Sequence, residues 1–324
     1  MPTVLEACAG GGGQALGLEA AGFTCQAAIE IEPAACKTLR DNRPDWRVIQ
    51  ADIKNVSAHE FRGVDVFAAG VPCPPFSIAG KQLGLLDERD LFPDALRLVE
   101  EARPAAVLIE NVPGLASAKF ASYRQGVMRR LARLGYAPEW HILNASDFGV
   151  PQLRPRFVLV ALRNGSARNF CWPGSTGRAP AVGATLFDLM ASRGWPGAER
   201  WAAKAESIAP TIVGGSKKHG GPDLGPTRAR LEWKRLGVDG LGIADEPPEA
   251  KFPVSGMPRL TLRMVARLQG FPDDWFFAGV KTAAYRQVGN AFPPPLADAV
   301  GAAIIRALSG TREPHIQSQL PLLA

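Results

Sequence analysis

The chain of 324 residues has few cysteines, and their arrangement argues against two common uses of this residue. The five cysteines are odd in number, scattered, and include no Cys-x-x-Cys pair. We therefore expect neither a disulfide framework nor a structural zinc site, and a reducing cytoplasm is the simplest location for such a chain. His219 has no set of partner ligands nearby, so we expect no bound metal.

Long apolar runs are lacking as well. No run is long enough to cross a bilayer, and residues 1–5 lack a basic flank and a cleavage site. We therefore expect neither a membrane span nor an export signal. An apolar content of 46% with 21% charged residues is typical of a soluble globular protein, and the length allows one large domain or two smaller ones.

Acidic residues are scarce in one stretch of the chain. Residues 163–235 contain twelve Lys or Arg against five Asp or Glu, a balance of +7 that exceeds the +6 of the whole chain. A basic stretch of this kind often binds a polyanion, although a solvated basic face explains the charge equally well.

The start of the chain predicts a strand, a glycine turn and a helix, over residues 3–9, 10–13 and 14–21. Such a turn lets the backbone approach a ligand closely. Glu30 follows a second expected strand at 23–29 and suits the two hydroxyls of a ribose. Asp52 and Ile53 follow a third, at 47–51, where they would face an adenine. Glycine spacing alone is compatible with a dehydrogenase, a methyl-donor site or a turn without a ligand.

A single cysteine follows the next expected strand, at 64–69, in the run Pro72-Cys73-Pro74-Pro75. Prolines fix φ and exclude both a helix and a paired strand, so Cys73 is expected on a stiff turn that suits a nucleophile. The alternative for a lone cysteine is a small buried hydrophobic residue.

Three further side chains belong to this group of candidates. Glu110 ends an expected strand at 105–109 and would lie on the ligand-binding edge of an open α/β sheet, unless it is simply a solvated acid. Before another expected strand, at 157–162, alternation places Gln152, Arg154 and Arg156 on one side of an extended segment. Long donors in a row suit base edges or phosphates, and plain surface arginines are the alternative.

Five motifs, taken in order, resemble those of the prokaryotic DNA (cytosine-5) methyltransferases of restriction-modification systems. They are Ala9-Gly10-Gly11-Gly12-Gly13, Pro72-Cys73-Pro74-Pro75-Phe76-Ser77, Glu110-Asn111-Val112, Gln152-x-Arg154-x-Arg156 and Gln287-Val288-Gly289-Asn290-Ala291. The resemblance covers residues 3–163 and 258–305. It implies an α/β, Rossmann-like S-adenosylmethionine-dependent methyltransferase fold with a second, smaller, loop-rich recognition domain. The implied division is 1–163 plus 283–310 for catalysis, 164–282 for recognition and hinge, and 311–324 for a tail.

The resemblance implies methyl transfer from S-adenosyl-L-methionine to C5 of a cytosine flipped out of double-stranded DNA. Cys73 would attack C6, Glu110 would bind or protonate N3, and Arg156 would bind O2. Arg154 would support the loop or a phosphate. This chemistry requires a lowered pKa for Cys73 and a raised one for Glu110.

The donor pocket carried over from the resemblance spans all the motifs. Its residues are Ala9, Gly10, Gly12, Gly13, Glu30, Ile31, Asp52, Ile53, Pro72, Leu91, Asn290 and Ala291. Four positions depart from the commonest pattern: Glu6 stands in place of Asp, Cys8 and Ile31 in place of aromatics that often flank the adenine, and Pro74 in place of Gln. Stacking on the adenine is therefore expected to be weaker or replaced by aliphatic packing.

Residues 164–257 are rich in Gly, Pro and Arg, and we expect them to form the loop-rich recognition region. The expected DNA-binding residues are Thr211, Lys217, Lys218, Arg228 and Arg230. The last two are candidates for guanine contacts, although phosphate contacts are at least as common. A Thr-capped helix is expected after this region, from Thr261, with another helix at 296–308.

Four functions therefore compete: a DNA cytosine methyltransferase acting as a monomer, a tRNA cytosine methyltransferase, a non-catalytic DNA-binding regulator and a nicotinamide dehydrogenase. Cys73, Glu110 and Arg156 favour catalysis over the regulator, and the basic stretch favours DNA over tRNA. The Pro-Cys-Pro-Pro turn has no use in a dehydrogenase.

Overall fold

The computed structural model describes residues 1–72, 90–215 and 221–311. The expected nucleophile Cys73, the neighbouring Pro74, the two lysines Lys217 and Lys218, and the tail from residue 312 lie outside the described residues.

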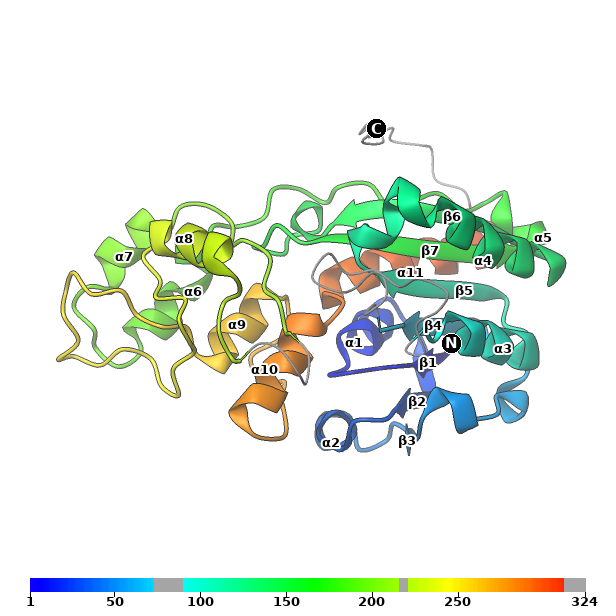
Figure 1. The fold of residues 1–324 in the computed structure, drawn as a ribbon, viewed down its shortest axis with the longest axis horizontal. Coiled ribbons are helices and arrows are strands. Elements are labelled where there is room, and N and C mark those ends of the chain that lie inside the picture. The colour runs from blue at the N-terminus through cyan, green and yellow to red at the C-terminus, as the bar shows by residue number, and fades with distance from the viewer. Residues whose placement is uncertain (73–89, 216–220, 312–324) are drawn as a thin grey trace.

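A seven-stranded sheet forms the centre of the larger part of the molecule, in the order β3-β2-β1-β4-β5-β7-β6 (Figure 1). β7 runs antiparallel to both β5 and β6, and the pairs among the first five strands are parallel. The strands are β1 (Thr3–Ala7), β2 (Thr24–Glu30), β3 (Val48–Gln50), β4 (Val66–Gly70), β5 (Ala106–Asn111), β6 (Tyr136–Asn144) and β7 (Pro155–Arg163).

The buried strands lie where the apolar runs predict them, whereas β6 is missing from the sequence expectations. β6 is an edge strand, and several of its side chains, including His141 and Ile142, are exposed. It also contains Pro138, which is tolerated at a sheet edge and weakens the strand signal in the sequence. An edge position therefore explains why the pattern was not recognised.

Helices cover both faces of the sheet. α1 (Gly13–Ala20) and α11 (Pro294–Leu308) share an apolar core with alternate residues of the central strands, such as Val66 and Leu108. α3 (Phe92–Ala102) and α4 (Ala121–Arg133) pack against the intervening residues, such as Phe67 and Ile109. α2 (Pro33–Asn42) packs beside β2 and β3. This two-faced burial is what a mostly parallel sheet requires.

A second group of helices lies away from the sheet (Figure 1). It contains α6 (Val182–Ala191), α7 (Ala198–Lys204) and α8 (Thr227–Arg235), while α5 (Asn164–Ala167) lies next to β7. These short helices were not expected, because they stand between glycines and prolines that obscure their periodicity. They enclose Trp195, Trp201 and Trp233, all buried.

Two helices stand between this group and the sheet (Figure 1). α9 (Leu262–Leu268) contacts α6, and α10 (Lys281–Asn290) contacts α2. Thr261 caps α9 as expected, since its hydroxyl accepts a bond from the Met264 amide at 3.3 Å. One apolar core runs from Leu39 through Trp275 to Trp233, across the boundary expected between the two domains. None of the helices in the described ranges is long and apolar enough to cross a membrane.

Candidate active site

The carboxyl ends of the parallel strands bring the predicted polar residues to one edge of the sheet. Glu6 is paired with Ala28 and Ala68, and Gly70 is paired with Glu110. Glu30 lies two residues after Ala28, and Gly70 lies two residues after Ala68. Because successive residues of a strand alternate between its two faces, the face covered by α1 carries Glu6, Glu30, Gly70 and Glu110. Arg156 of β7 has the same parity, because its strand neighbour Val158 is paired with Glu110.

The glycine turn after β1 needs a backbone that most residues avoid. Cys8, Gly10 and Gly12 all have positive φ, at 54°, 55° and 87°. A Cβ on Gly12 would lie 2.8 Å from side-chain atoms of both Leu39 and Trp275. The Trp275 indole donates to the carbonyl of Gly11 at 3.0 Å. The turn is therefore held between α2 and the segment that precedes α10.

Glu30 supports the same turn from the end of β2. Its Oε2 accepts a bond from the Gly10 amide at 2.7 Å, and its Oε1 accepts from the amides of Ile31 and Glu32 at 2.8 Å each. Burial raises the pKa of this carboxyl, and the three amide bonds oppose that effect. Oε2, with one bond, keeps a lone pair for a further donor, as the expected ribose contact requires.

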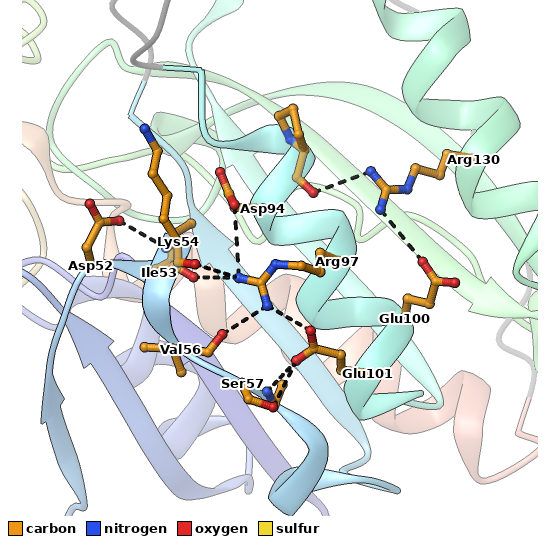
Figure 2. A network of polar contacts seen from close by, with 12 residues as sticks. Asp52, Ile53, Lys54, Val56, Ser57, Asp94, Arg97, Glu100, Glu101 and Arg130 are labelled. Atoms are coloured by element: carbon orange, nitrogen blue, oxygen red, sulfur yellow. Dashed lines mark hydrogen bonds and ion pairs between the residues drawn. The ribbon is translucent and has the colours of Figure 1, made fainter.

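The loop after β3 is fixed by an arginine that the sequence did not single out (Figure 2). Arg97 of α3 donates to the carbonyls of Ile53 and Val56, at 2.7 and 2.9 Å, and to Glu101 Oε1 at 2.7 Å. The carboxylate of Asp52 accepts from the amide of Lys54 at 3.0 Å and begins the 3-10 turn η1 (Ile53–Asn55). These hydrogen bonds hold in place the loop that is expected to face the adenine.

Glu110 and Arg156 form a buried ion pair. Arg156 Nε lies 2.6 Å from Glu110 Oε1, and the two side chains are only 8% and 10% exposed. The alternative of a solvated acid at this strand end is therefore wrong. Burial raises the pKa of Glu110, and the positive charges of Arg156 and Arg154 reduce that rise without cancelling it.

Arg154 is fully buried, so the alternative of a surface arginine is wrong for it as well. Its guanidinium donates to the carbonyls of Ile212, Gly289 and Ala291, at 2.6, 2.7 and 2.9 Å. Because these bonds join the segment before β7 to the expected recognition region and to the end of α10, Arg154 has a structural role in this arrangement. A DNA phosphate does not reach a side chain with no exposed surface.

The remaining expected donor-pocket residues lie in or beside the glycine turn, after strands β2, β3 and β4, at the start of α3 and at the end of α10. Ala9, Gly12, Gly13, Ile53 and Ala291 are buried, Gly10, Asp52 and Leu91 are half-buried, and Ile31, Pro72 and Asn290 are exposed. A Cβ on Gly13 would lie 2.4 Å from the carbonyl oxygen of Phe292, next to Ala291. The turn and the segment at the end of α10 are therefore in direct contact.

The described residues expected to bind DNA differ in exposure and in the contacts that they already make. The Thr211 hydroxyl donates to the carbonyl of Leu153, so only its lone pairs remain for a ligand. Arg228 is 94% exposed, with its Nε 3.8 Å from Glu232 Oε1. Arg230 lines a hollow with Asp223, Gly215 and Gly225.

Three of the cysteines are unsuited to nucleophilic attack. Burial raises the pKa of Cys36 to about 11 and that of Cys25 to about 12, and it raises the pKa of Cys8 further. Each therefore remains a thiol at neutral pH. Within the described ranges, no cluster of His, Cys, Asp and Glu could hold a metal ion.

One residue of this edge escaped the sequence reasoning. Gln14, on the first turn of α1, is 3% exposed, and in the described part of the chain neither atom of its amide has a hydrogen-bond partner. A glutamine at the start of an expected helix carries no sequence signal for burial.

The strand order, the glycine turn after β1 and the acid after β2 define an S-adenosylmethionine-dependent methyltransferase fold. The chain belongs to the C-5 cytosine-specific DNA methylase family, whose model matches residues 3–306. It is therefore a sequence-specific DNA cytosine C5 methyltransferase.

Two similar proteins are type II methyltransferases. M.NaeI of Lentzea aerocolonigenes is 58% identical over 312 residues, which are 94% of this chain and 75% of that one. M.NgoMIV of Neisseria gonorrhoeae is 53% identical over 94% of this chain and 98% of its own length.

Solved structures with the same fold include the Dnmt2 methyltransferase of S. pombe, with a TM-score of 0.64 and 20% identity over 95% of this chain and 99% of that one. The methyltransferase EhMeth of Entamoeba histolytica has a TM-score of 0.69 and 15% identity over the same shares of the two chains.

Proposed function

We propose that this enzyme takes its methyl group from S-adenosyl-L-methionine and attaches it to cytosine through a covalent bond between Cys73 and C6. The donor supplies an electrophilic methyl group at the site. The described residues fit such a donor, because Glu30 and the left-handed turn at Gly10 and Gly12 form a fixed cradle at the sheet edge. Ile31 and Asp52–Ile53 border this cradle on the adenine side.

The proposed reaction begins with a cytosine turned out of the duplex, because its C5 and C6 are not accessible in the stack. The Cys73 thiolate adds to C6 while Glu110 donates its proton to N3, and the electron pair moves to C5. C5 would then take the methyl group as the bond between the methyl carbon and the donor sulfur breaks, which would leave S-adenosylhomocysteine. Loss of the C5 proton, return of the N3 proton and departure of the thiolate restore the aromatic ring.

The Glu110–Arg156 pair is the observation that carries this proposal. Burial favours the protonated form of Glu110, the form that can donate to N3, while Arg156 keeps the side chain in one orientation. In the proposed complex, Arg156 also donates to the cytosine O2. An acid that must donate a proton near neutral pH requires this kind of environment.

The DNA partner follows from the family, and we propose double-stranded DNA as the substrate and a monomer as the acting form. The exposed Arg228 suits a phosphate, and Arg230, beside a hollow lined by glycines, suits a base edge. Thr211, Lys217 and Lys218 complete the proposed DNA contacts. Because both relatives are named type II methyltransferases, we propose that the enzyme belongs to a restriction-modification system and protects host DNA in the cytoplasm.

A methylation assay with tritiated donor tests this proposal on duplex DNA, with tRNA as the alternative substrate. We expect label in the DNA only, and at C5 of cytosine. Cys73→Ala should abolish transfer and leave DNA binding intact, and Cys36→Ala serves as the control. Full activity of Cys73→Ala, or label in tRNA alone, would contradict the proposal.

Specificity is tested separately by replacing each of the two arginines with glutamine. Arg230→Gln should relax the recognised site, measured by bisulfite sequencing of host DNA after expression. Arg228→Gln should weaken DNA binding without changing the recognised site. The DNA affinity of this variant should also depend less steeply on salt concentration. An unchanged site in Arg230→Gln would remove Arg230 from base recognition.

A further inference from the structure

The Gln14 amide is a buried polar group without a partner among the described residues. It is 3% exposed, and neither Nε2 nor Oε1 makes a hydrogen bond within the described part of the chain. Leaving both ends of an amide unpaired in the interior is destabilising, and nearly all buried polar groups in proteins are paired. A bound group that pairs with this amide would explain its position.

Three oxygen atoms from three different elements surround one open point near this amide. A Cβ built on Gly70 would lie 3.5 Å from the carbonyl oxygen of Cys8, 3.8 Å from Glu110 Oε2 and 3.9 Å from Gln14 Oε1. Because Gly70 has no Cβ, no atom of the described residues fills this point. The Cys8 carbonyl and Gln14 Oε1 are both acceptors, and two converging acceptors suit a group with several N–H donors, such as an ammonium.

The position of this point also indicates which part of a ligand would lie there. It is next to Cys8, which enters the glycine turn, and next to the end of β4, which leads to Pro72 and Cys73. Gln14 itself belongs to the first turn of α1, whose amides and dipole favour a carboxylate. An ammonium and a carboxylate together are the ends of an α-amino acid.

We propose that Gln14 binds the methionine part of the donor: its Oε1, with the Cys8 carbonyl, accepts from the α-ammonium, and its Nε2 donates to the α-carboxylate. This inference rests on the proposed donor, S-adenosylmethionine, and adds a binding residue to it. An uncharged amide has an acceptor oxygen at one end and two N–H donors at the other, so it can match both ends of such a zwitterion.

Two ligands that differ only in this part test the proposal. S-adenosylhomocysteine carries the amino acid, and 5′-methylthioadenosine lacks it. In calorimetric titrations of the full-length protein, Gln14→Met should bind S-adenosylhomocysteine at least about tenfold more weakly than the wild type, since bonds to charged groups are lost. Its affinity for 5′-methylthioadenosine should be unchanged, which also shows that the pocket is folded. Gln26→Met, an exposed position in β2, is the matched control and should change neither affinity.

Two results would overturn the proposal: equal losses of affinity for both ligands, or no loss for either, including no loss together with a shifted pH profile of methyl transfer. The shifted profile would show that Gln14 acts on the ionisation of Glu110 and not on the donor. Failure of the wild-type protein to bind S-adenosylhomocysteine would contradict the proposed donor itself, so the two failures are distinguishable.

Discussion

Three buried carboxyl groups at the sheet edge show how burial sets the chemistry of single residues. Burial is the largest cause of the raised pKa of Glu6, Glu30 and Glu110 alike. Their partners differ, because Glu30 is bound by three amides and Glu110 by Arg156, whereas Glu6 Oε2 has no partner among the described residues. We therefore expect different consequences when each is replaced.

Glu110→Gln should retain the shape of the side chain and lose its transferable proton. We expect kcat to fall by about 100-fold or more, the usual contribution of a general acid. In the wild type, activity should decline as pH rises through the pKa of Glu110, because Glu110 then loses the proton that it donates. The variant should lack this decline. Single-turnover methylation from pH 5.5 to 9 measures both effects, with the exposed Glu100→Gln as the control. Near-normal turnover in Glu110→Gln would contradict the role of the acid.

Glu6 should make the protein less stable as pH rises. Its pKa in the folded chain lies well above the unfolded value, so unfolding releases a proton between those two pH values. Stability is then greatest below the unfolded pKa and falls as pH rises toward the folded one. Glu6→Gln should remove this slope, up to about 1.4 kcal/mol per pH unit. Urea unfolding at pH 5.5 and 8 measures the slope, and the exposed Glu249→Gln should not change it. An unaltered slope in Glu6→Gln would show that Glu6 is ionised when folded.

At the scale of elements, the packing of α1 against α11 depends on the absence of a side chain. A Cβ on Gly17 would lie 2.3 Å from the carbonyl oxygen of Pro294 and 2.5 Å from the Cβ of Ala297. The two helices therefore approach more closely than alanine allows. This contact holds the glycine turn next to the end of α10.

Gly17→Ala should destabilise the protein by about 2–3 kcal/mol, because the clash involves backbone that cannot rotate away. Gly126→Ala is the matched substitution in α4, where a Cβ meets nothing within 4 Å. It should stabilise the protein by up to about 1 kcal/mol through helix propensity. Denaturant unfolding of both variants measures the contrast. Equal effects would contradict the close packing of α1 and α11.

At the scale of the whole molecule, Arg154 connects parts of the chain that are far apart in sequence. Its carbonyl partners Ile212, Gly289 and Ala291 lie 58, 135 and 137 positions away. It therefore joins the segment before β7 to the expected recognition region and to the segment at the end of α10. The apolar core that continues from Leu39 to Trp233 connects the same parts.

Arg154→Met should destabilise the protein by about 3 kcal/mol or more, because three buried carbonyls lose their donors. Arg228→Met, at a side chain that is 94% exposed, should change stability by no more than about 0.5 kcal/mol. Urea unfolding followed by tryptophan fluorescence measures both. A small effect at Arg154 would show that water replaces the guanidinium.

The sequence predicted much of this molecule, and the failures have physical causes. Apolar runs indicated the buried strands, and strand ends indicated Glu30 and Glu110, since both signals are local. The edge strand β6, the helices α6 to α8 and the interior position of Arg154 depend on packing between distant segments, which no local pattern records. Gln14 was missed for the same reason, because its burial depends on how α1 packs in the folded chain.

The most direct test uses a duplex that carries 5-fluorocytosine at the methylated position, incubated with the enzyme and S-adenosylmethionine. Fluorine at C5 prevents the final proton loss, so the account predicts a stable protein–DNA adduct, mapped by mass spectrometry to the peptide containing Cys73. Methyl transfer to the normal duplex without any such adduct, or an adduct at another cysteine, would contradict it.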